Sequence, residues 1–301
     1  MTVSRFAPAP TGYLHLGHVV NAVYVWGLTK AAGGRVLLRI EDHDRQRSRR
    51  EYEHAILDDL DWLGFVPDDP ATADFRSGVC RGRQSDRQGV YEAALARLRA
   101  AGVTYACECS RADILAAGEP SGELRYPGTC AHKGLADAPG RGVRIRLAPS
   151  VEQFDDLRHG PLEQRPSEQC GDLLARDRDG NWTYQFAVAA DDLDQGISLV
   201  VRGDDLLAST GRQIQLARML GRQAPPAFFH HPLIMKTATQ KLSKADRDTS
   251  VRDLRASGIA PLEVIGRACR LAGLTDGRLA LSAADAMAHV AERWASTVKR
   301  L

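Results

Sequence analysis

Near the N-terminus, an apolar run of helical character stands between a loop and a strand-like segment, and this order constrains the fold most. Residues 6–12 are rich in Pro and Gly, and residues 19–32 form the apolar run. The glycine pair at 33–34 predicts the end of a helix. Residues 35–40 are strand-like, and within them 36–40 form the continuous apolar run expected of a buried strand in a parallel sheet. This order predicts a strand–turn–helix–strand unit, and hence an α/β protein with a parallel sheet.

The middle of the chain differs in composition from the segments that flank it. Apolar residues recur at helical spacing over 51–64 and 90–98, and we expect both helices to pack on the sheet. From about residue 102 to 139, Cys, Gly, Pro and Ser accumulate, and residues 143–147 alternate like a strand. We interpret this middle region as an insertion into the α/β domain.

The parallel sheet is expected to resume after the insertion. Residues 182–189 and 197–202 show strand patterns, residues 204–220 predict a long helix, and the chain from Pro225 onward is predicted to be helical. The expected organisation is the first half of the α/β domain at 1–104, an insertion at 105–181, the second half at 182–224, and a loop with a small helical region at 225–301.

The composition excludes several classes of protein. The chain has 301 residues with 40 basic and 38 acidic side chains, and the net charge of +2 excludes a polyanion-binding tail as the main device. No apolar stretch reaches 18 residues, and residues 1–12 lack the basic and then apolar layout of a signal peptide. We expect a cytoplasmic protein with no membrane partner.

Residues 15–18 read HLGH and lie where the first long helix is expected to begin. A helix N-terminus presents unpaired N–H groups and a positive partial charge, so His15 and His18 there could grip a phosphate chain. Gly17 would let a flat base approach the backbone. The chain has neither a Walker lysine motif nor GxGxxG. Taken in isolation, HLGH fits a helix-capping loop with two surface histidines better than a nucleotide site.

Residues 241–244 read KLSK and form the second candidate motif. Two lysines three residues apart in a loop, Lys241 and Lys244, can neutralise charge that develops on a pyrophosphate leaving group. Alone, such a pair is more often solvated charge.

Together and in this order, HLGH and KLSK resemble the HIGH and KMSKS signatures of class I aminoacyl-tRNA synthetases. Five further segments resemble the glutamyl-tRNA synthetase family: RFAPAPTG at 5–12, RIED at 39–42, AADD at 189–192, RGDD at 202–205 and HPLI at 231–234. The resemblance covers most of residues 3–250 and implies a Rossmann-like parallel sheet. It implies catalytic roles for His15, His18, Lys241 and Lys244, and ATP binding by His15, Gly17, His18 and Lys244.

A pocket for glutamate needs a cation for each carboxylate, and an anion or carbonyl groups for the ammonium. The family holds glutamate with residues that match Arg5, Glu41, Tyr184 and Arg202, and backbone groups of Ala7 and Ala9 can contribute. Glu41 and Arg202 each end an expected strand, so both could project into the crevice at the carboxyl edge of the sheet. Alternatively, these two residues pair with other protein charges in a structural network. Family members have Ser where this chain has Ala9, so one hydroxyl contact to the amino acid would be missing.

Cys107, Cys109 and Cys130 provide three soft ligands in one region, and tetrahedral zinc needs a fourth. Chemistry alone favours His132, because imidazole is a common zinc ligand and a phenol is rare. The Cys-x-Cys and Tyr-x-x-x-Cys pattern resembles the short paralogues of glutamyl-tRNA synthetase, and this resemblance favours Tyr126. Such a site would be structural, since it would pin an insertion with little core of its own. Three free thiols in a reducing compartment are the alternative.

The chain ends soon after KLSK, so we expect no anticodon-reading domain. This length, the Cys and Tyr pattern and the RDG at 178–180 resemble the glutamyl-queuosine tRNA(Asp) synthetases. That resemblance implies activation of glutamate by ATP with Mg²⁺, and transfer to queuosine in the anticodon of tRNA(Asp). Two alternatives remain: a shortened glutamyl-tRNA synthetase that charges the tRNA 3′ end, and a non-catalytic tRNA-binding remnant.

Overall fold

The computed structural model covers residues 1–301 and describes all of them except 118–122, 235–249, 276, 278–279 and 300–301. The strands are β1 (Val3–Phe6), β2 (Arg35–Leu38), β3 (Thr104–Cys107), β4 (Gly142–Ile145), β5 (Glu152–Asp156), β6 (Gly160–Gln164), β7 (Leu173–Arg176), β8 (Leu199–Gly203) and β9 (Ala227–His231). The helices are α1 (Leu16–Ala31), α2 (Arg50–Leu63), α3 (Thr72–Arg76), α4 (Gln88–Ala100), α5 (Arg111–Ala117), α6 (Pro166–Gln169), α7 (Tyr184–Asp194), α8 (Thr210–Met219), α9 (Val251–Ala256), α10 (Pro261–Leu271), α11 (Ala283–Arg293) and α12 (Ala295–Val298).

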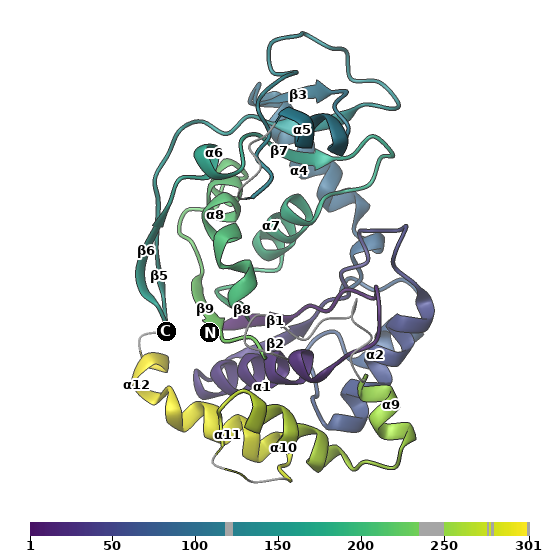
Figure 1. Ribbon diagram of the computed structural model, residues 1–301, viewed down its shortest axis with the longest axis vertical. Coiled ribbons are helices and arrows are strands. Elements are labelled where there is room, and N and C mark those ends of the chain that lie inside the picture. Colours follow the sequence, from purple (N-terminus) through teal and green to yellow (C-terminus); the bar gives the residue numbers. More distant parts are fainter. Residues whose placement is uncertain (118–122, 235–249, 276, 278–279, 300–301) are drawn as a thin grey trace.

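A parallel sheet forms the centre of the larger lobe (Figure 1). β1 pairs in parallel with β2, and β9 pairs in parallel with both β8 and β5, whose other edge carries the antiparallel β6. The backbone N–H of Ser198 donates to the Val3 carbonyl at 2.9 Å, which joins β8 to β1 edge to edge. The expected parallel sheet is therefore confirmed. The carboxyl ends of its parallel strands lie at the same edge of the sheet, where a binding site can form.

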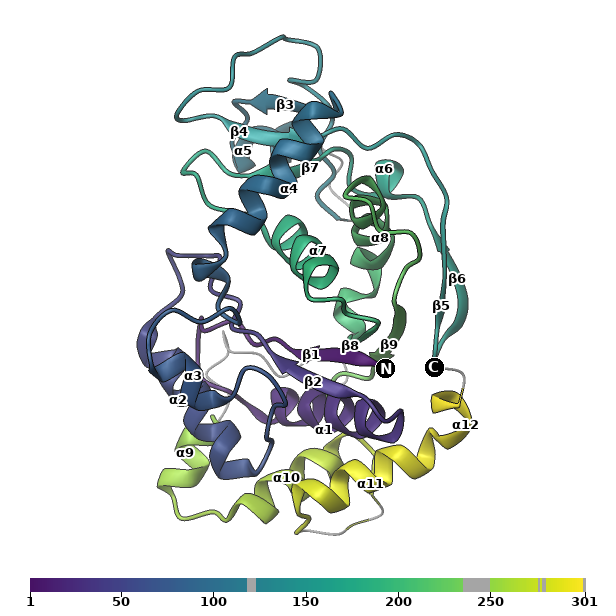
Figure 2. The same ribbon diagram turned by 180° about the vertical axis from the view of Figure 1, so that it is seen from behind.

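Helices cover both faces of this sheet. α1 lies between the sheet and the C-terminal α10 and α11, while α7 and α8 cover the opposite face (Figures 1 and 2). Residues 22–29 of α1 are all buried, as is typical of a helix enclosed on every side. The smaller lobe holds the antiparallel sheet β3–β4–β7 and α5, and it lies at the far end of α4.

The strand expected at residues 182–189 is wrong. The chain becomes helical at Tyr184 and forms α7, which continues to Asp194. Trp182 and Phe186 lie four residues apart and stack with ring centroids 5.2 Å apart, so the apolar residues follow helical spacing and not alternation. A segment of eight residues, two of them Ala, is too short to distinguish the helical period of 3.6 from the strand period of 2.

Two further expectations need correction. The helix predicted from residue 204 begins later, because Asp204–Ser209 form a 3₁₀ turn and α8 starts at Thr210. The purely helical C-terminal region is also wrong, since residues after Pro225 first form β9. Its two histidines obscure the strand pattern, although both are buried. Of the described helices, none is long and apolar enough to cross a bilayer.

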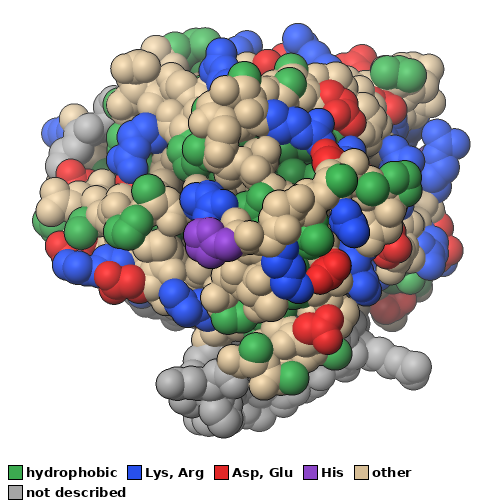
Figure 3. Space-filling view, turned by 90° about the horizontal axis from the view of Figure 1, so that it is seen from above, with side chains coloured by type: hydrophobic (Ala, Val, Ile, Leu, Met, Phe, Trp, Pro, Cys, Tyr) green, Lys and Arg blue, Asp and Glu red, His purple; other side chains and the backbone are tan. Residues whose placement is uncertain are grey.

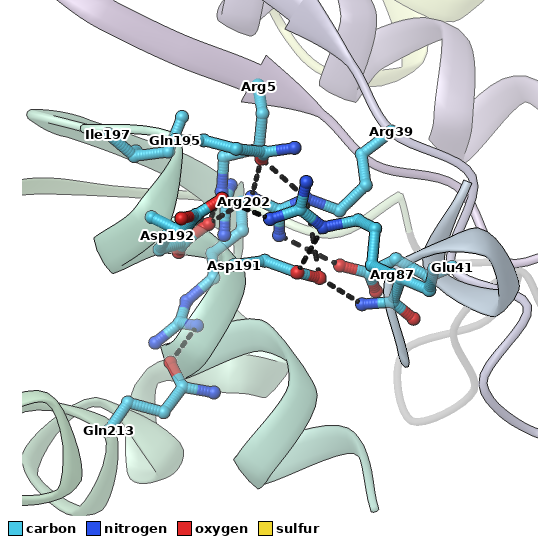
Figure 4. Close-up of polar contacts among 12 residues, drawn as sticks. Arg5, Arg39, Glu41, Arg87, Asp191, Asp192, Gln195, Ile197, Arg202 and Gln213 are labelled. Atoms are coloured by element: carbon cyan, nitrogen blue, oxygen red, sulfur yellow. Dashed lines mark hydrogen bonds and ion pairs between the residues drawn. The ribbon is translucent and has the colours of Figure 1, made fainter. Parts of the chain in front are cut away.

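A buried ionic network ties α7 to the sheet and to α4 (Figure 4). Arg5 Nε donates to Asp192 Oδ1 at 3.0 Å, and Arg39, which is fully buried, donates to the same carboxylate. Arg87 Nε donates to Asp191 Oδ1 at 2.7 Å. Burial opposes the charge on Asp192, but the guanidinium groups of Arg5 and Arg39 outweigh it and lower the pKa of Asp192 to about 2.

Asp192→Asn should lower the free energy of unfolding at pH 7 by about 3–5 kcal/mol, because Arg5 and Arg39 would lose the carboxylate that compensates them. Denaturant titration measures this. The pKa of Asp192 is about 2 in the folded protein against an ordinary 3.8, so its contribution is complete above the unfolded value and is lost as the pH falls through the folded one. The difference in the free energy of unfolding between the wild type and Asp192→Asn should therefore become smaller below about pH 4. A difference that does not change with pH would contradict this prediction.

Gly27→Ala should destabilise the packing of α1 on α11. A Cβ at Gly27 would lie 2.9 Å from Val290 Cβ, and such overpacking costs about 1–3 kcal/mol. Gly89→Ala in α4 is the matched control, because its Cβ would meet nothing within 4 Å and only the gain in helix propensity should remain. Thermal unfolding compares the two variants. Equal melting temperatures of Gly27→Ala and Gly89→Ala would show that α11 moves to accommodate the added methyl group without loss of stability.

Candidate active site

A cavity of about 500 Å³ opens at the carboxyl edge of β1, β8 and β9, beside the N-terminus of α1. The structure brings together in its wall nine residues that the sequence singled out: Arg5, Ala7, Ala9, His15, Gly17, His18, Glu41, Tyr184 and Arg202. They come from four separate regions of the chain, at residues 5–18, 41, 184 and 202. Their convergence follows from the parallel sheet, because strands that run the same way end at the same edge.

Two histidines cap the first helix of the fold. His15 is the N-cap residue of α1, and its Nδ1 accepts the backbone N–H of Gly17 at 3.1 Å. His18 Nδ1 accepts the backbone N–H of His15, also at 3.1 Å. An Nδ1 atom that accepts carries no proton, so the neutral ring holds its proton on Nε2. Capping and cavity lining therefore occur together in HLGH, and its role in nucleotide binding stays a prediction.

Gly17 is required by the ring of His15. A Cβ at this position would lie 2.8 Å from His15 Cε1, so any larger residue displaces the capping imidazole. In the structure, Gly17 leaves room for the imidazole of His15. The expected role, close approach of a flat base to the backbone, stays a prediction. His15 and His18 remain close, with ring centroids 4.0 Å apart.

Arg202 is a buried cation held by neutral groups. Its Nε donates to His230 Nε2 at 2.9 Å, its Nη1 to Gln213 Oε1 at 2.6 Å and its Nη2 to Thr210 Oγ1 at 2.9 Å. The side chain is 3% exposed, and burial lowers its pKa. No carboxylate of a described residue forms an ion pair with it. Arg202 therefore forms no ion-pair network with the carboxylates of the described residues. An anion in the cavity would supply the missing negative charge.

Glu41 stands across the same cavity and is bound less tightly than Asp192. Arg39 Nη1 approaches its Oε1 at 3.5 Å, which is a long contact. Burial raises the pKa of Glu41, while Arg39 and His43 act in the opposite direction. Burial also raises the pKa of Tyr184, so its hydroxyl keeps its proton as a donor.

Lys241 and Lys244 lie outside the described residues, but the residues that flank this segment are placed. Ile234 lines the cavity. Ser250 bridges to His15, and the Val251 N–H donates to the Leu14 carbonyl at 2.8 Å. The chain therefore leaves the wall of the cavity at residue 234 and returns beside the capped end of α1.

Sequence reasoning missed four other polar residues of the wall, Thr11, Asn21, Asp205 and His231. Asn21 follows His18 by three residues and so shares its face of α1. Asp205 and His231 belong to the RGDD and HPLI segments already noted. In each case the signal was present as a polar residue next to a strand end or a helix start.

Three cysteines and a tyrosine cluster in the smaller lobe. The Sγ atoms of Cys107, Cys109 and Cys130 lie within 4.8 Å of one another, and Cys109 Sγ is 3.5 Å from Cys130 Sγ. The Tyr126 hydroxyl lies 3.5 Å from Cys107 Sγ and 4.0 Å from Cys109 Sγ. Zinc–sulfur bonds of about 2.3 Å in a tetrahedron would place sulfur atoms about 3.8 Å apart, so these positions fit zinc. His132 is exposed and does not belong to the cluster.

Arg144 supports this cluster from one side. Its Cζ lies 3.5 Å from the centre of the Tyr126 ring, and its Nε lies 3.3 Å from Cys107 Sγ. A cation here would stabilise thiolate ligands. At this end of the molecule, Lys and Arg side chains are interspersed with Asp and Glu (Figure 3), so the visible face is of mixed charge.

Comparisons with known proteins agree with this geometry. The family model for tRNA synthetases class I (E and Q), catalytic domain, matches residues 1–296. The glutamyl-Q tRNA(Asp) synthetase of Symbiobacterium thermophilum is 40% identical over 289 residues, which cover 92% of this chain and 88% of the relative. The same enzyme of Rhodobacter capsulatus is 38% identical over 283 residues, which cover 87% of this chain and 98% of the relative.

Solved structures agree on the fold. A crystal structure of glutamate-tRNA synthetase from Elizabethkingia anophelis superposes with a TM-score of 0.76 at 25% identity, and the match covers 95% of this chain and 65% of that one. This chain thus spans about two thirds of the length of that synthetase. The class I synthetase fold expected from the two motifs is confirmed. The chain belongs to the class I tRNA synthetases for glutamate and glutamine, and within them to the glutamyl-Q tRNA(Asp) synthetase family.

Proposed function

We propose that this protein activates L-glutamate with ATP to glutamyl adenylate and transfers the glutamate to queuosine in the anticodon of tRNA(Asp). The observation that carries the proposal is Arg202, a buried guanidinium without a carboxylate partner among the described residues, in a cavity that Glu41 also lines. The names of the relatives support the choice of substrates.

The wall of the cavity matches the charges of glutamate. Arg202 receives a carboxylate through two N–H groups of its planar fork. Glu41 receives the ammonium group, and Arg5 adds positive charge on the same wall although Asp192 already holds its Nε. The Tyr184 hydroxyl donates to the substrate, and Ala7 and Ala9 contribute backbone groups. Ala9 offers no hydroxyl, which costs about 0.5–1.5 kcal/mol of affinity unless water substitutes.

The ATP phosphates lie at the N-terminus of α1 in this proposal. The positive end of the helix and the Nε2–H groups of His15 and His18 face the phosphate chain, with Gly17 keeping the His15 ring in place. The glutamate α-carboxylate attacks the α-phosphorus and pyrophosphate leaves, so no protein nucleophile is needed. Lys241 and Lys244 would neutralise the leaving pyrophosphate, and Mg²⁺ that accompanies ATP would offset part of its negative charge.

We also propose that Cys107, Cys109, Tyr126 and Cys130 hold a structural zinc ion. The apolar cluster of this region contains few residues, and three of the four ligands belong to it as buried side chains. A tetrahedral metal would supply the stability that such a small core lacks. The ion would hold the smaller lobe and take no part in the chemistry.

The exchange of labelled pyrophosphate into ATP tests the activation step. We expect exchange with glutamate, and much less with aspartate or glutamine, because only glutamate matches both charged ends of the cavity. Lys244→Ala should reduce the exchange rate by about a hundredfold or more, the effect of removing one group that stabilises developing charge. No exchange with glutamate would contradict the proposal and favour a tRNA-binding remnant.

The same preparation decides the acceptor. Glutamate transfer is measured on tRNA(Asp) with queuosine, before and after removal of its terminal CCA. Acceptance that survives trimming supports the queuosine base as acceptor, and tRNA(Asp) without queuosine is the matched control that should accept nothing. Loss of acceptance on trimming would identify the enzyme as one that charges the 3′ end.

Metal analysis tests the zinc site. Protein purified without chelator should contain about one equivalent of zinc. Tyr126→Phe should weaken zinc binding in a chelator competition by at least tenfold, while His132→Ala should leave it unchanged, because His132 is exposed and outside the cluster. The opposite pattern would make His132 the fourth ligand.

A further inference from the structure

Three neighbouring strands place an Asp, a His and an Arg in one row across the sheet. Arg202 on β8 lies directly opposite His230 on β9 in the strand register. On the other side of β9, Asp156 ends β5 and pairs with Phe228, two residues before His230. The row leads from the cavity wall at Arg202 on β8 across β9 to β5, toward the edge of the sheet that β6 forms.

Short hydrogen bonds join the three side chains. His230 Nδ1 lies 2.6 Å from Asp156 Oδ2, and Arg202 Nε lies 2.9 Å from His230 Nε2. Asp156 is 1% exposed, His230 is 0% exposed and Arg202 is 3% exposed. Water therefore does not compete for these bonds, and each contributes more than it would at the surface.

The donor on Arg202 fixes every proton in the row. A guanidinium can only donate, so His230 Nε2 must accept and the ring proton must lie on Nδ1. That N–H donates to Asp156, whose Oδ2 also accepts the His230 backbone N–H at 3.1 Å. Asp156 Oδ1 accepts the backbone N–H groups of Arg158 and His159, each at 2.9 Å. Asp156 thus faces only donors and stays ionised, while His230 stays neutral.

These bonds also define the plane of the Arg202 guanidinium. His230, Gln213 and Thr210 each hold a different nitrogen of Arg202. Gln213 and its bond to Arg202 are visible in Figure 4. Of the five N–H groups of a guanidinium, these three bonds use three, and the Tyr184 hydroxyl also interacts with the Arg202 side chain.

We propose that Asp156 and His230 are positioning residues that orient Arg202 for the carboxylate of glutamate. This inference rests on the proposed function and adds two residues to its binding site. Asp156 makes no direct contact with Arg202 and acts through the imidazole. Since β5 lies within residues 105–181, the segment expected to be an insertion supplies part of the support for the amino-acid pocket.

Two substitutions break the row in different ways. His230→Asn keeps an amide near the position of Nδ1 but leaves Arg202 Nε without an acceptor. Asp156→Asn keeps the shape, and its oxygen accepts from the backbone N–H groups of residues 158 and 159. The NH₂ group of the new side chain then faces Nδ1 of His230, so the ring proton moves to Nε2. The N–H on Nε2 of His230 and the Nε–H of Arg202 are both donors and would then face each other.

The test measures KM for glutamate and for ATP separately in pyrophosphate exchange. Both variants should raise the KM for glutamate by tenfold or more while the KM for ATP stays within twofold, since the histidine caps of α1 are untouched. His230→Gln, which can place an amide oxygen near Nε2, should recover most of the affinity for glutamate. His54→Asn on the exposed face of α2 is the matched control and should behave as wild type.

The outcomes separate this inference from the function on which it rests. A wild-type protein without glutamate-dependent exchange overturns the proposed function, and the inference with it. A wild-type protein that exchanges, with both variants folded by thermal unfolding and unchanged in KM for glutamate, overturns the inference alone. Equal rises in the two KM values would show a merely structural role and also overturn it. If His230→Asn does not fold, the nearly isosteric Asp156→Asn decides the question.

Discussion

The candidate site depends on the buried positive charge of Arg202, which no carboxylate of the described residues balances in an ion pair. Arg5 and Arg39 are also buried, but Asp192 lies against both of them. Arg202 instead meets an imidazole, an amide and a hydroxyl. Burial of a cation among neutral groups is costly, and hydrogen bonds recover only part of that cost. In the proposed function, a ligand that brings a carboxylate would recover the remainder, and Arg202 would then contribute to both affinity and specificity.

In the first helix, the same residues cap the N-terminus and line the cavity. Helix N-termini usually take Ser, Thr, Asp or Asn as caps. His15 and His18 replace these residues in α1, and each uses Nδ1 for the cap. An Asp cap would add negative charge to this wall of the cavity, whereas a neutral capping imidazole adds none and keeps one ring N–H that is not used by the cap. The capping bond therefore decides which nitrogen of each ring can donate to a ligand.

Much of this site could be predicted from the sequence because its residues follow strand ends. Glu41 follows the apolar run of β2, and Arg202 lies in that of β8, so the parallel sheet alone places them at one edge. The row from Asp156 to His230 could not be predicted, because its members are 74 residues apart and β5 begins in a region of weak pattern. α7 was missed for another reason: its first turns contain Ala and aromatic residues that suit both periods. Hydrogen-bond partners that no periodicity encodes appear only in three dimensions.

The smaller lobe and the amino-acid pocket share supports, although they look separate in the ribbon (Figure 1). Arg212 on α8 forms an ion pair with Glu123, three residues before Tyr126 in the cysteine cluster. The next residue of α8 is Gln213, which holds Arg202. The backbone N–H of Tyr126 donates to the Cys170 carbonyl at 2.9 Å, which fixes the loop a second time. The loop that carries Tyr126 thus contacts the same helix that holds the guanidinium of Arg202. If Arg202 binds the substrate as proposed, the order of the smaller lobe would affect substrate binding even though none of its cysteines lines the cavity.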